Sequence, residues 1–559
     1  MFVRSKSKRR GKSIIRIVFA VAIYGLLIGL MAQEATTYRA DEKNRNRPDR
    51  VEWFRDAGFG LFITWGVDSQ LGSVISHSMV GASEDYLKRL TDDLPKSFNP
   101  KKFDPEEWAI LAKLAGIKYV VFTAKHHSGF CMFATATTDF SVINTRYGRD
   151  ITARVINAFR EQGIAVGYLF SPDDFHWLYK HGKLIDRNRP EVAPSQNPGL
   201  MDYDKAQLEE LLTRYGPIDV LFLDGPPEGL KELAWDLQPN IVVTRGAMET
   251  PEQYVPGTPI EEPWETCQTM GESWEYKPTN EVYKSGTELI NMLIETRAKG
   301  GNLLLNVGPK PDGELPVEHE ARLREIALWN FVNGESIYDV RPWTVTNESD
   351  IWFTKRKNED TVYAFIENTP WKLGEWKSFT LKSVQATGET VISVLGQNDK
   401  ILEYRPEVVP QTKWQQDEKG LHITVMRAQR LYNNRKWPNP VVLKITHAKP
   451  GLKPPAITTG NATWDPVTKT ATLYAELKSL GNAESVEISF QYRSQKALTD
   501  MYERTTPWHE MAFVKVSAPG VYSQRLAVLK GGEPYEFRAI VKHPSITLYG
   551  REVAFRTEK

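Results

Sequence analysis

A regular alternation of apolar runs and amphipathic segments between residues 58 and 332 constrains the fold more than any other feature of this chain. The apolar runs have no polar face, so they predict strands that are buried on both sides, as in parallel sheets. The expected strands are residues 58–65, 118–124, 164–170, 218–223, 240–244 and 302–307. The expected helices are residues 105–115, 151–162, 203–214, 230–237, 286–298 and 318–332.

About seven or eight such β-then-α units in roughly 300 residues favour a (β/α)8 TIM-like barrel over an open doubly wound sheet. No glycine-rich loop follows the first expected strand, which argues against a dinucleotide-binding fold. The chain of 559 residues is also too long for a single hydrophobic core. We therefore expect an α/β protein in which the barrel is followed by two all-β sandwich domains.

After Trp343 the pattern changes to short alternating segments that are typical of antiparallel sheets. The expected boundaries are residues 33–343 for the barrel, residues 344–448 for a β-sandwich and residues 455–559 for a fibronectin-III-like sandwich. A proline-rich linker begins at Lys449. Neither β region contains a recognisable chemical motif, so a structural role is favoured over binding to sugar surfaces.

The N-terminus has the form of a secretory signal peptide. Seven basic residues precede an apolar run over residues 17–30, and Ala32 follows as a small residue at the expected cleavage point. An uncleaved anchor is the alternative, but the run is shorter than a typical span of ~20 residues. We expect residues 1–32 to be removed and the protein to be exported to the periplasm or the extracellular space, without stable membrane insertion.

Removal of this segment changes the formal charge from +1 to about −6, which gives no reason to expect a nucleic-acid partner. The two cysteines, Cys131 and Cys267, stand in no metal-ligand pattern. We expect both to be free and buried, although an exported protein could join them.

Asp224 is the first candidate for chemistry, because it directly follows the expected strand over residues 218–223, a run rich in β-branched and aromatic residues. Barrel enzymes place their catalytic residues at the carboxyl ends of parallel strands. The alternative is a turn or helix cap, since Asp before Gly is common turn chemistry. The rest of the chain favours the catalytic interpretation.

Other polar residues also follow expected strands. His126 and His127 come directly after the second strand, and Arg245 comes after the fifth. Nothing supplies a further metal ligand at the usual spacing, so the histidines are expected to hydrogen-bond sugar hydroxyls rather than a metal. The plainer alternative is one structural histidine bonded to a backbone carbonyl.

Glutamates on the later loops are candidates for the second carboxyl group of a glycosidase, which needs one ionised and one protonated carboxyl. Glu249, Glu252 and Glu265 all qualify, and each taken singly is more often a solvated loop residue. Glu265 is preferred because Trp264 and Cys267 give it apolar neighbours.

Several motifs in order resemble glycoside hydrolase family 29, the α-L-fucosidases. They run over residues 51–343 and comprise residues 53–55 (Trp-Phe-Arg), 59–66 (Phe-Gly-Leu-Phe-Ile-Thr-Trp-Gly), 103–108 (Phe-Asp-Pro-Glu-Glu-Trp), 119–130 (Tyr-Val-Val-Phe-Thr-Ala-Lys-His-His-Ser-Gly-Phe), 223–225 (Leu-Asp-Gly), 264–267 (Trp-Glu-Thr-Cys) and 300–309 (Gly-Gly-Asn-Leu-Leu-Leu-Asn-Val-Gly-Pro). The resemblance implies a retaining glycosidase without metal or cofactor, acting on a fucosylated oligosaccharide or glycoconjugate.

The resemblance also implies roles for individual residues. Asp224 matches the nucleophile, and Glu265 matches the acid/base best, with Glu252 and Glu249 as alternatives. The histidine pair and Arg245 match residues around the sugar, and Trp65 and Trp264 are expected to contact substrate as well.

Three positions depart from the family pattern. Thr64 replaces a histidine, Glu84-Asp85-Tyr86 stands where the family has Glu-Trp-Tyr, and Glu275 replaces the glycine of Trp-Gly-Tyr. These changes leave two alternatives open beside an α-L-fucosidase: a glycosidase for another galactose-configured sugar, and a protein that binds fucosylated glycans without cleaving them.

Overall fold

The computed structural model describes residues 44–72, 76–431, 438–494, 507–527 and 529–557. The expected signal peptide, residues 1–32, lies outside the described residues. Among the described helices, none combines the length and the hydrophobicity that crossing a bilayer requires.

The first part of the chain is built on a parallel sheet of seven strands in the order β5-β4-β3-β2-β1-β7-β6. Six of the seven coincide with expected strands, since continuous apolar runs are stable only where both faces are covered. The strands are β1 (Phe59–Ile63), β2 (Tyr119–Lys125), β3 (Ala165–Phe170), β4 (Val220–Leu223), β5 (Val242–Val243), β6 (Glu265–Thr269) and β7 (Asn302–Val307).

A short irregular segment takes the place of a further barrel strand between β5 and β6. Parallel bridges join Glu249 to Trp264 and Glu252 to Cys267, and an Arg245–Met248 bridge joins the segment to the chain after β5. The backbone N–H of Gln253 donates to the carbonyl of Cys267 at 3.0 Å. This pairing continues the sheet around the barrel, as the TIM-like architecture predicted from the sequence requires.

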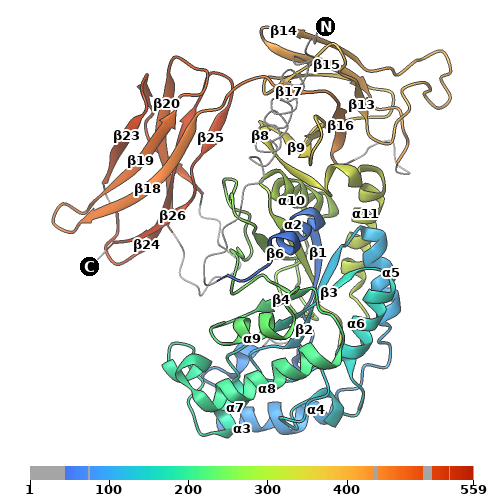
Figure 1. Cartoon of the computed structure of the whole chain (residues 1–559), viewed down its shortest axis with the longest axis vertical. Helices are drawn as coiled ribbons and strands as arrows, with labels where there is room; N and C mark the ends of the chain where they lie inside the picture. The colour runs from blue at the N-terminus through green and yellow to red at the C-terminus, as the bar shows by residue number, and fades with distance from the viewer. Residues whose placement is uncertain (1–43, 73–75, 432–437, 495–506, 528, 558–559) are drawn as a thin grey trace, which may run out of the picture.

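Helices pack against the outside of this sheet, as Figure 1 shows for α5, α6, α8 and α9. Three of them, α5, α9 and α10, have the bounds predicted from the sequence. Helix α8 begins five residues earlier than predicted, because Asn197 caps it and Pro198 occupies its first position. The helices are α2 (Pro48–Ala57), α3 (Glu84–Lys88), α4 (Leu94–Ser97), α5 (Pro105–Ala115), α6 (Ile151–Glu161), α7 (Phe175–Lys180), α8 (Pro198–Arg214), α9 (Leu230–Leu237), α10 (Gly286–Ala298) and α11 (Val317–Asn333).

The strands alternate between two hydrophobic cores. Phe62, Val121 and Phe222 belong to a cluster inside the barrel, whereas Leu61, Val120 and Leu221 pack with the helices in a larger outer cluster. This period of two decides which side chains face the barrel interior. Cys131 and Cys267 are both buried and free, as predicted.

The first β region contains a five-stranded sheet (β13-β16-β10-β9-β8), a three-stranded sheet (β11-β15-β14) and the pair β12-β17. Figure 1 shows this region beyond α10 and α11. Its strands are β8 (Val340–Glu348), β9 (Ile351–Arg356), β10 (Val362–Ile366), β11 (Trp376–Leu381), β12 (Val384–Gln385), β13 (Ile392–Val394), β14 (Lys413–Asp417), β15 (Gly420–Met426), β16 (Val441–Ile445) and β17 (Lys449–Pro450).

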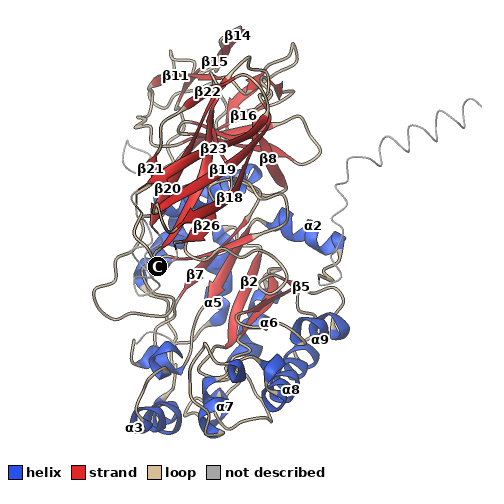
Figure 2. Cartoon of the chain, turned by 90° about the vertical axis from the view of Figure 1, so that its left-hand side faces the viewer, coloured by secondary structure: helices blue, strands red, loops and turns tan. Residues whose placement is uncertain are grey.

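The second β region has one sheet of β18-β19-β23 and another built on β21-β20-β24-β25, to which β22 and β26 add. In Figure 2 the strands of both β regions gather at the end of the molecule away from helices α3 and α7. The strands are β18 (Ala456–Asp465), β19 (Thr470–Ser479), β20 (Val486–Ser494), β21 (His509–Glu510), β22 (Val514–Val516), β23 (Gly520–Ala527), β24 (Pro534–Lys542), β25 (Thr547–Tyr549) and β26 (Val553–Arg556).

Candidate active site

Asp224 directly follows β4, at the carboxyl end of the barrel sheet. Val220 and Phe222 point into the inner core, so the alternation of the strand directs Asp224 to the same side. Its backbone N–H donates to the carbonyl of Phe170 at the end of β3, at 3.0 Å. The carboxylate is 19% exposed, which leaves it both anchored and accessible.

Arg245 links Asp224 to a second carboxylate. One guanidinium nitrogen lies 2.8 Å from Oδ1 of Asp224, and the other lies 3.0 Å from Oε2 of Glu252. The guanidinium also lies over the ring of Phe222, 4.6 Å from its centroid. The planar, two-pronged geometry of arginine suits such a bridge and fixes both carboxylates at the barrel mouth.

The histidine pair contacts the other oxygen of Asp224. Nε2 of His127 lies 3.3 Å from Oδ2, and Nε2 of His126 lies 3.7 Å from the same atom. Nδ1 of His127 is held by Asp173 at 2.5 Å, and Nδ1 of His126 by the hydroxyl of Ser76 at 2.5 Å. Both rings are therefore oriented by partners behind them.

The charges of this cluster follow from its contacts. Burial alone would raise the pKa of Asp224, but His127 and Arg245 hold it well below its usual range. Burial disfavours the charged form of His127, yet the carboxylates of Asp173 and Asp224 raise its pKa to about 9. Burial and the charge of His127 lower the pKa of His126, so His126 is neutral.

A buried ion pair network supports the histidine pair from behind. Lys125, the last residue of β2, contacts Asp204 at 2.7 Å and Asp174 at 3.3 Å, and all three side chains are inaccessible to solvent. Burial opposes its charge, but the two carboxylates raise the pKa of Lys125. Gly129 has φ of +82°, and a Cβ there would lie 2.2 Å from Asp174. This close packing fixes the loop that carries His126 and His127.

His126, His127 and Asp224 together offer three possible metal-ligand atoms within 4.8 Å of one another. The sequence supplied no third ligand for the histidines, whereas the fold brings Asp224 to them. Both nitrogens of His127 are already engaged by carboxylates, and Arg245 holds the remaining oxygen of Asp224. This distribution of positive charge favours a hydrogen-bonded carboxylate over a site for a metal cation.

The structure adds three residues that the sequence analysis did not single out. Asp173 holds His127 and also contacts Arg187 at 3.3 Å, and the ring of His77 lies 5.8 Å from that of His127. Burial and the charges of His127 and Arg187 lower the pKa of His77 to about 4. Asp173 follows β3 as Asp224 follows β4, so the same strand-end rule could have found it. His77 lies in a short 3-10 helix (Ser76–Met79) and Arg187 in an irregular segment, and neither follows a strand end.

Glu265 is not brought to this cluster. It is the first residue of β6 and pairs in register with Asn302, the first residue of β7, so it lies at the amino end of the barrel. Its side chain is fully buried and accepts a hydrogen bond from Tyr119, the first residue of β2. The sequence predicts a loop over residues 261–267, because a strand whose inner residues are Glu, Cys and Thr shows no apolar pattern.

Of the other two glutamates, only Glu252 joins Asp224. Glu249 is paired with Arg551 of the second β region, at 2.6 Å and 2.7 Å. The segment that replaces a barrel strand therefore directs Glu249 and Glu252 to different partners. Glu252 takes the position at the mouth for which Glu265 was the preferred candidate.

The two candidate tryptophans also lie away from Asp224. Trp65 is buried in the outer core against Phe103 and Trp108. Trp264 is buried at the amino end, where its indole N–H donates to the carbonyl of Lys299 at 3.4 Å. Both are only 1% exposed: Trp65 belongs to the core between barrel and helices, and Trp264 lies against Gly301.

Two of the three departures from the family pattern, Thr64 and Glu275, are structurally connected. The hydroxyl of Thr64 donates to Asn306 at 2.6 Å, and the amide of Asn306 donates to the carbonyl of Trp274. The next residue, Glu275, is buried against Asp68, and burial followed by the charge of Asp68 raises its pKa well above the usual range. At least one of these two carboxyls is therefore protonated at neutral pH.

Comparisons with known proteins identify the family of this chain. The family model described as Alpha-L-fucosidase matches residues 27–335. An α-L-fucosidase of Branchiostoma floridae is 30% identical over 62% of this chain and 84% of its own length, and the plasma α-L-fucosidase of Rattus norvegicus is 29% identical over 65% and 87%.

Solved structures of α-L-fucosidases are also similar to this chain. α-L-Fucosidase isoenzyme 1 of Paenibacillus thiaminolyticus is 28% identical, with a TM-score of 0.58 over 71% of this chain and 98% of its own. The Thermotoga maritima α-fucosidase in complex with fucose is 26% identical, with a TM-score of 0.56 over 71% and 96%. The family model matches more than half of the chain, which shows that this protein belongs to the α-L-fucosidase family and is a glycoside hydrolase.

Proposed function

We propose that this protein hydrolyses α-L-fucosides of fucosylated oligosaccharides or glycoconjugates with retention of configuration. The observation that carries the proposal is the pair of carboxylates at the barrel mouth, Asp224 and Glu252, held by one guanidinium group. The shared guanidinium fixes the two carboxylates at the same barrel mouth, and hydrolysis with retention uses a pair of carboxyl groups about 5–5.5 Å apart. Membership of the α-L-fucosidase family supports the choice of sugar.

Asp224 is the proposed nucleophile, because its neighbours keep it ionised. Its oxygen attacks C1 of the fucosyl group while the bond from C1 to the leaving oxygen breaks, which forms a glycosyl ester. Glu252, in its protonated form, donates its proton to the leaving oxygen. It then accepts a proton from water as that water attacks C1, and the ester bond breaks to release Asp224.

The neighbouring side chains have supporting roles in this proposal. The neutral ring of His126 hydrogen-bonds a sugar hydroxyl, and Arg245 orients both carboxylates. His127 stabilises the Asp224 carboxylate before the first step and again as the ester bond breaks in the second, because Asp173 keeps His127 charged. These assignments replace Glu265 by Glu252 as the acid/base.

The test is Asp224→Ala in the full chain, assayed on an aryl α-L-fucoside and on a panel of other aryl glycosides. Asp219→Ala is the matched control: Asp219 precedes the same strand at its other end, where it pairs with Arg50 at 2.7 Å. We expect Asp224→Ala to lose turnover and Asp219→Ala to keep it. NMR of the first released sugar should show the α-anomer.

Three outcomes would contradict the proposal. Substantial turnover by Asp224→Ala would remove Asp224 as nucleophile, and release of the β-anomer would remove the double displacement. Cleavage of a galactoside in preference to the fucoside by the wild type would change the substrate. Binding of fucosylated glycans with no product after long incubation would favour a non-catalytic protein.

We also propose that residues 1–32 are a cleaved signal peptide and that the enzyme acts outside the cytoplasm. The basic start, the apolar run over residues 17–30 and Ala32 support this. Mass spectrometry of the protein recovered from the secreted fraction should give a mature N-terminus near residue 33. A full-length mass in that fraction would contradict cleavage.

A further inference from the structure

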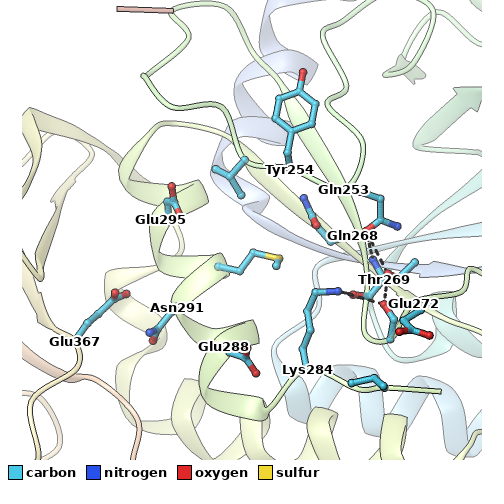
Figure 3. A pocket seen from close by; sticks show the side chains of 14 residues that line it. Gln253, Tyr254, Gln268, Thr269, Glu272, Lys284, Glu288, Asn291, Glu295 and Glu367 are labelled. Atoms are coloured by element: carbon cyan, nitrogen blue, oxygen red, sulfur yellow. Dashed lines mark hydrogen bonds between the residues drawn. The ribbon is translucent and has the colours of Figure 1, made fainter. Parts of the chain in front are cut away.

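A cavity of about 550 Å³ lies outside the barrel wall, separate from the Asp224 cluster. Figure 3 shows it between residues 253–255, the end of β6, helix α10 and Glu367 of the first β region. Neither Asp224 nor Glu252 lines it. The cavity is therefore distinct from the proposed active site, although it shares a wall with it.

The cavity exists because one part of the barrel lacks its outer helix. Residues 254–264, all of them described, connect the irregular segment to β6 without forming a helix. Cys267 points into the inner core, so the next residue of β6, Gln268, faces outwards into the uncovered space. Gln253 has φ of +62°, and its side chain lines the same space, held by the hydroxyl of Thr269 at 3.2 Å.

The acidic residues around the cavity already have partners. Glu272 pairs with Lys277 at 2.8 Å, and Glu295 pairs with Lys299 at 2.5 Å. Glu288 caps the first turn of α10 through Ser285. Since these carboxylates are neutralised or hydrogen-bonded, the lining is polar without a strong attraction for cations.

Two buried acceptors in the lining have no partner among the described residues. Glu367 is 6% exposed, and its Oε2 accepts from the indole of Trp352 at 3.1 Å, while its Oε1 is unpaired. Oδ1 of Asn291 is likewise unpaired. Leaving a buried acceptor unsatisfied costs about 1–3 kcal/mol, so a ligand that donates hydroxyl groups here is favoured. Burial and then Glu295 raise the pKa of Glu367 to about 8, so it also carries a proton to donate.

Lys284 also lines the cavity, where its ammonium group donates to the carbonyls of Thr269 and Gly271, and the other lining side chains include aromatic and apolar ones. Tyr254 stands at the rim with 47% of its surface exposed, and Val255 and Met292 line the interior. Amides, a carboxyl and an aromatic ring together match the hydroxyls and the C–H faces of a pyranose. We propose that this cavity is a second binding site, for a neutral oligosaccharide, on the outer face of the strand segment that carries Glu252.

The test is calorimetric titration of the full wild-type chain with lactose, a neutral disaccharide without fucose, in the presence of saturating L-fucose. We expect saturable binding that Asn291→Leu and Tyr254→Ala each weaken roughly tenfold, equivalent to about 1.4 kcal/mol. Asn157→Leu is the matched control, because Asn157 is an exposed asparagine on α6. All three variants should retain hydrolytic activity, which confirms folding.

Other outcomes overturn the proposal. These are no binding of lactose or cellobiose at high millimolar concentration, equal weakening by Asn157→Leu, or saturable binding of Ca²⁺ or spermidine alone. Lactose binding that L-fucose abolishes would place the ligand in the active site and also overturn it. Because lactose binding is measured without turnover, the result is independent of whether the fucoside hydrolysis proposed above is correct.

Discussion

Both ends of the barrel contain carboxyl and guanidinium groups, but the groups are fully buried at the amino end and partly exposed at the carboxyl end. At the amino end, Arg297 donates to the backbone carbonyls of Ile337, Gly301 and Arg55, and Glu265 accepts from Tyr119. At the carboxyl end, Arg245 bridges two carboxylates that remain partly exposed. The groups at the amino end therefore stabilise the structure, whereas those at the carboxyl end remain accessible for chemistry.

A buried carboxyl group with a displaced pKa is therefore not identified as a catalytic acid by these two properties alone. Burial raises the pKa of Glu265 to about 7, a value suited to acid/base catalysis. Its place at the closed end, however, keeps it from Asp224. Glu265 and Glu252 differ in position: only Glu252 lies near the carboxyl ends of the strands, where barrel enzymes place their catalytic residues.

The largest effect is expected when glutamate is exchanged for glutamine at each end of the barrel. We expect Glu252→Gln to lower kcat on substrates with poor leaving groups by roughly 10²–10⁴-fold, the usual contribution of a general acid. Glu265→Gln, the matched control, should retain most activity. Steady-state kinetics on natural and activated fucosides measure both, and azide should partly restore Glu252→Ala. The opposite ranking would return Glu265 to the role of acid/base.

The second prediction concerns the two arginines. Arg245→Lys keeps the charge but cannot bridge Asp224 and Glu252 through one planar group, so we expect kcat/KM to fall about 100-fold through misplacement of the carboxylates. Arg297→Lys should lower the melting temperature instead, with normal kinetics of the folded enzyme. Equal kinetic losses in the two variants would show that the ends are not functionally distinct.

The third prediction is a shift in the pH profile. The anion of Asp173 helps raise the pKa of His127 to about 9, so His127 stays charged below that pH and loses its proton above it. Asp173→Asn removes this anion and lowers the pKa of His127. We expect the alkaline limb of kcat/KM to move to lower pH in a series from pH 6 to 10. An unmoved limb would assign that limb to a group other than His127.

The smallest effect is expected on stability at the amino end. The folded-state pKa of Glu265, about 7, lies above the ordinary value of 4.5, so the folded chain binds the proton more tightly. Stability therefore falls as the pH rises from about 4.5 to 7, by about 3 kcal/mol at most. Glu265→Gln should remove this dependence, as thermal unfolding at pH 5 and pH 8 would show. An unchanged dependence would mean that Glu265 ionises freely.

Much of the site follows from local patterns in the chain. The apolar runs before Lys125, Asp224 and Arg245 predict buried strands, and the residues after them meet at one edge of the sheet. Asp173 obeys the same rule, although it was not singled out. The family motifs over residues 51–343 predicted the class of enzyme, which the comparisons show.

The choice among the glutamates did not follow from such patterns. The segment 249–253 forms no regular strand, and β6 contains no apolar run, so their positions in the barrel depend on pairing with each other. The inner residue Glu265 accepts a hydrogen bond from Tyr119, which is distant in the chain, and both Cys267 and Glu252 contact Arg245. Trp65 and Trp264 are equally ambiguous, because a tryptophan that fills a core and one that stacks on a sugar look alike in a sequence.

The sequence by itself therefore determined the barrel, its strand ends and the place of Asp224, because hydrophobic periodicity is local and strong. Only the tertiary structure decided that Glu252 faces Asp224 and that Glu265 lies at the closed end. The physical reason is register: a polar strand takes its position from hydrogen bonds to neighbouring strands and from distant partners. Those contacts exist only once the barrel has closed.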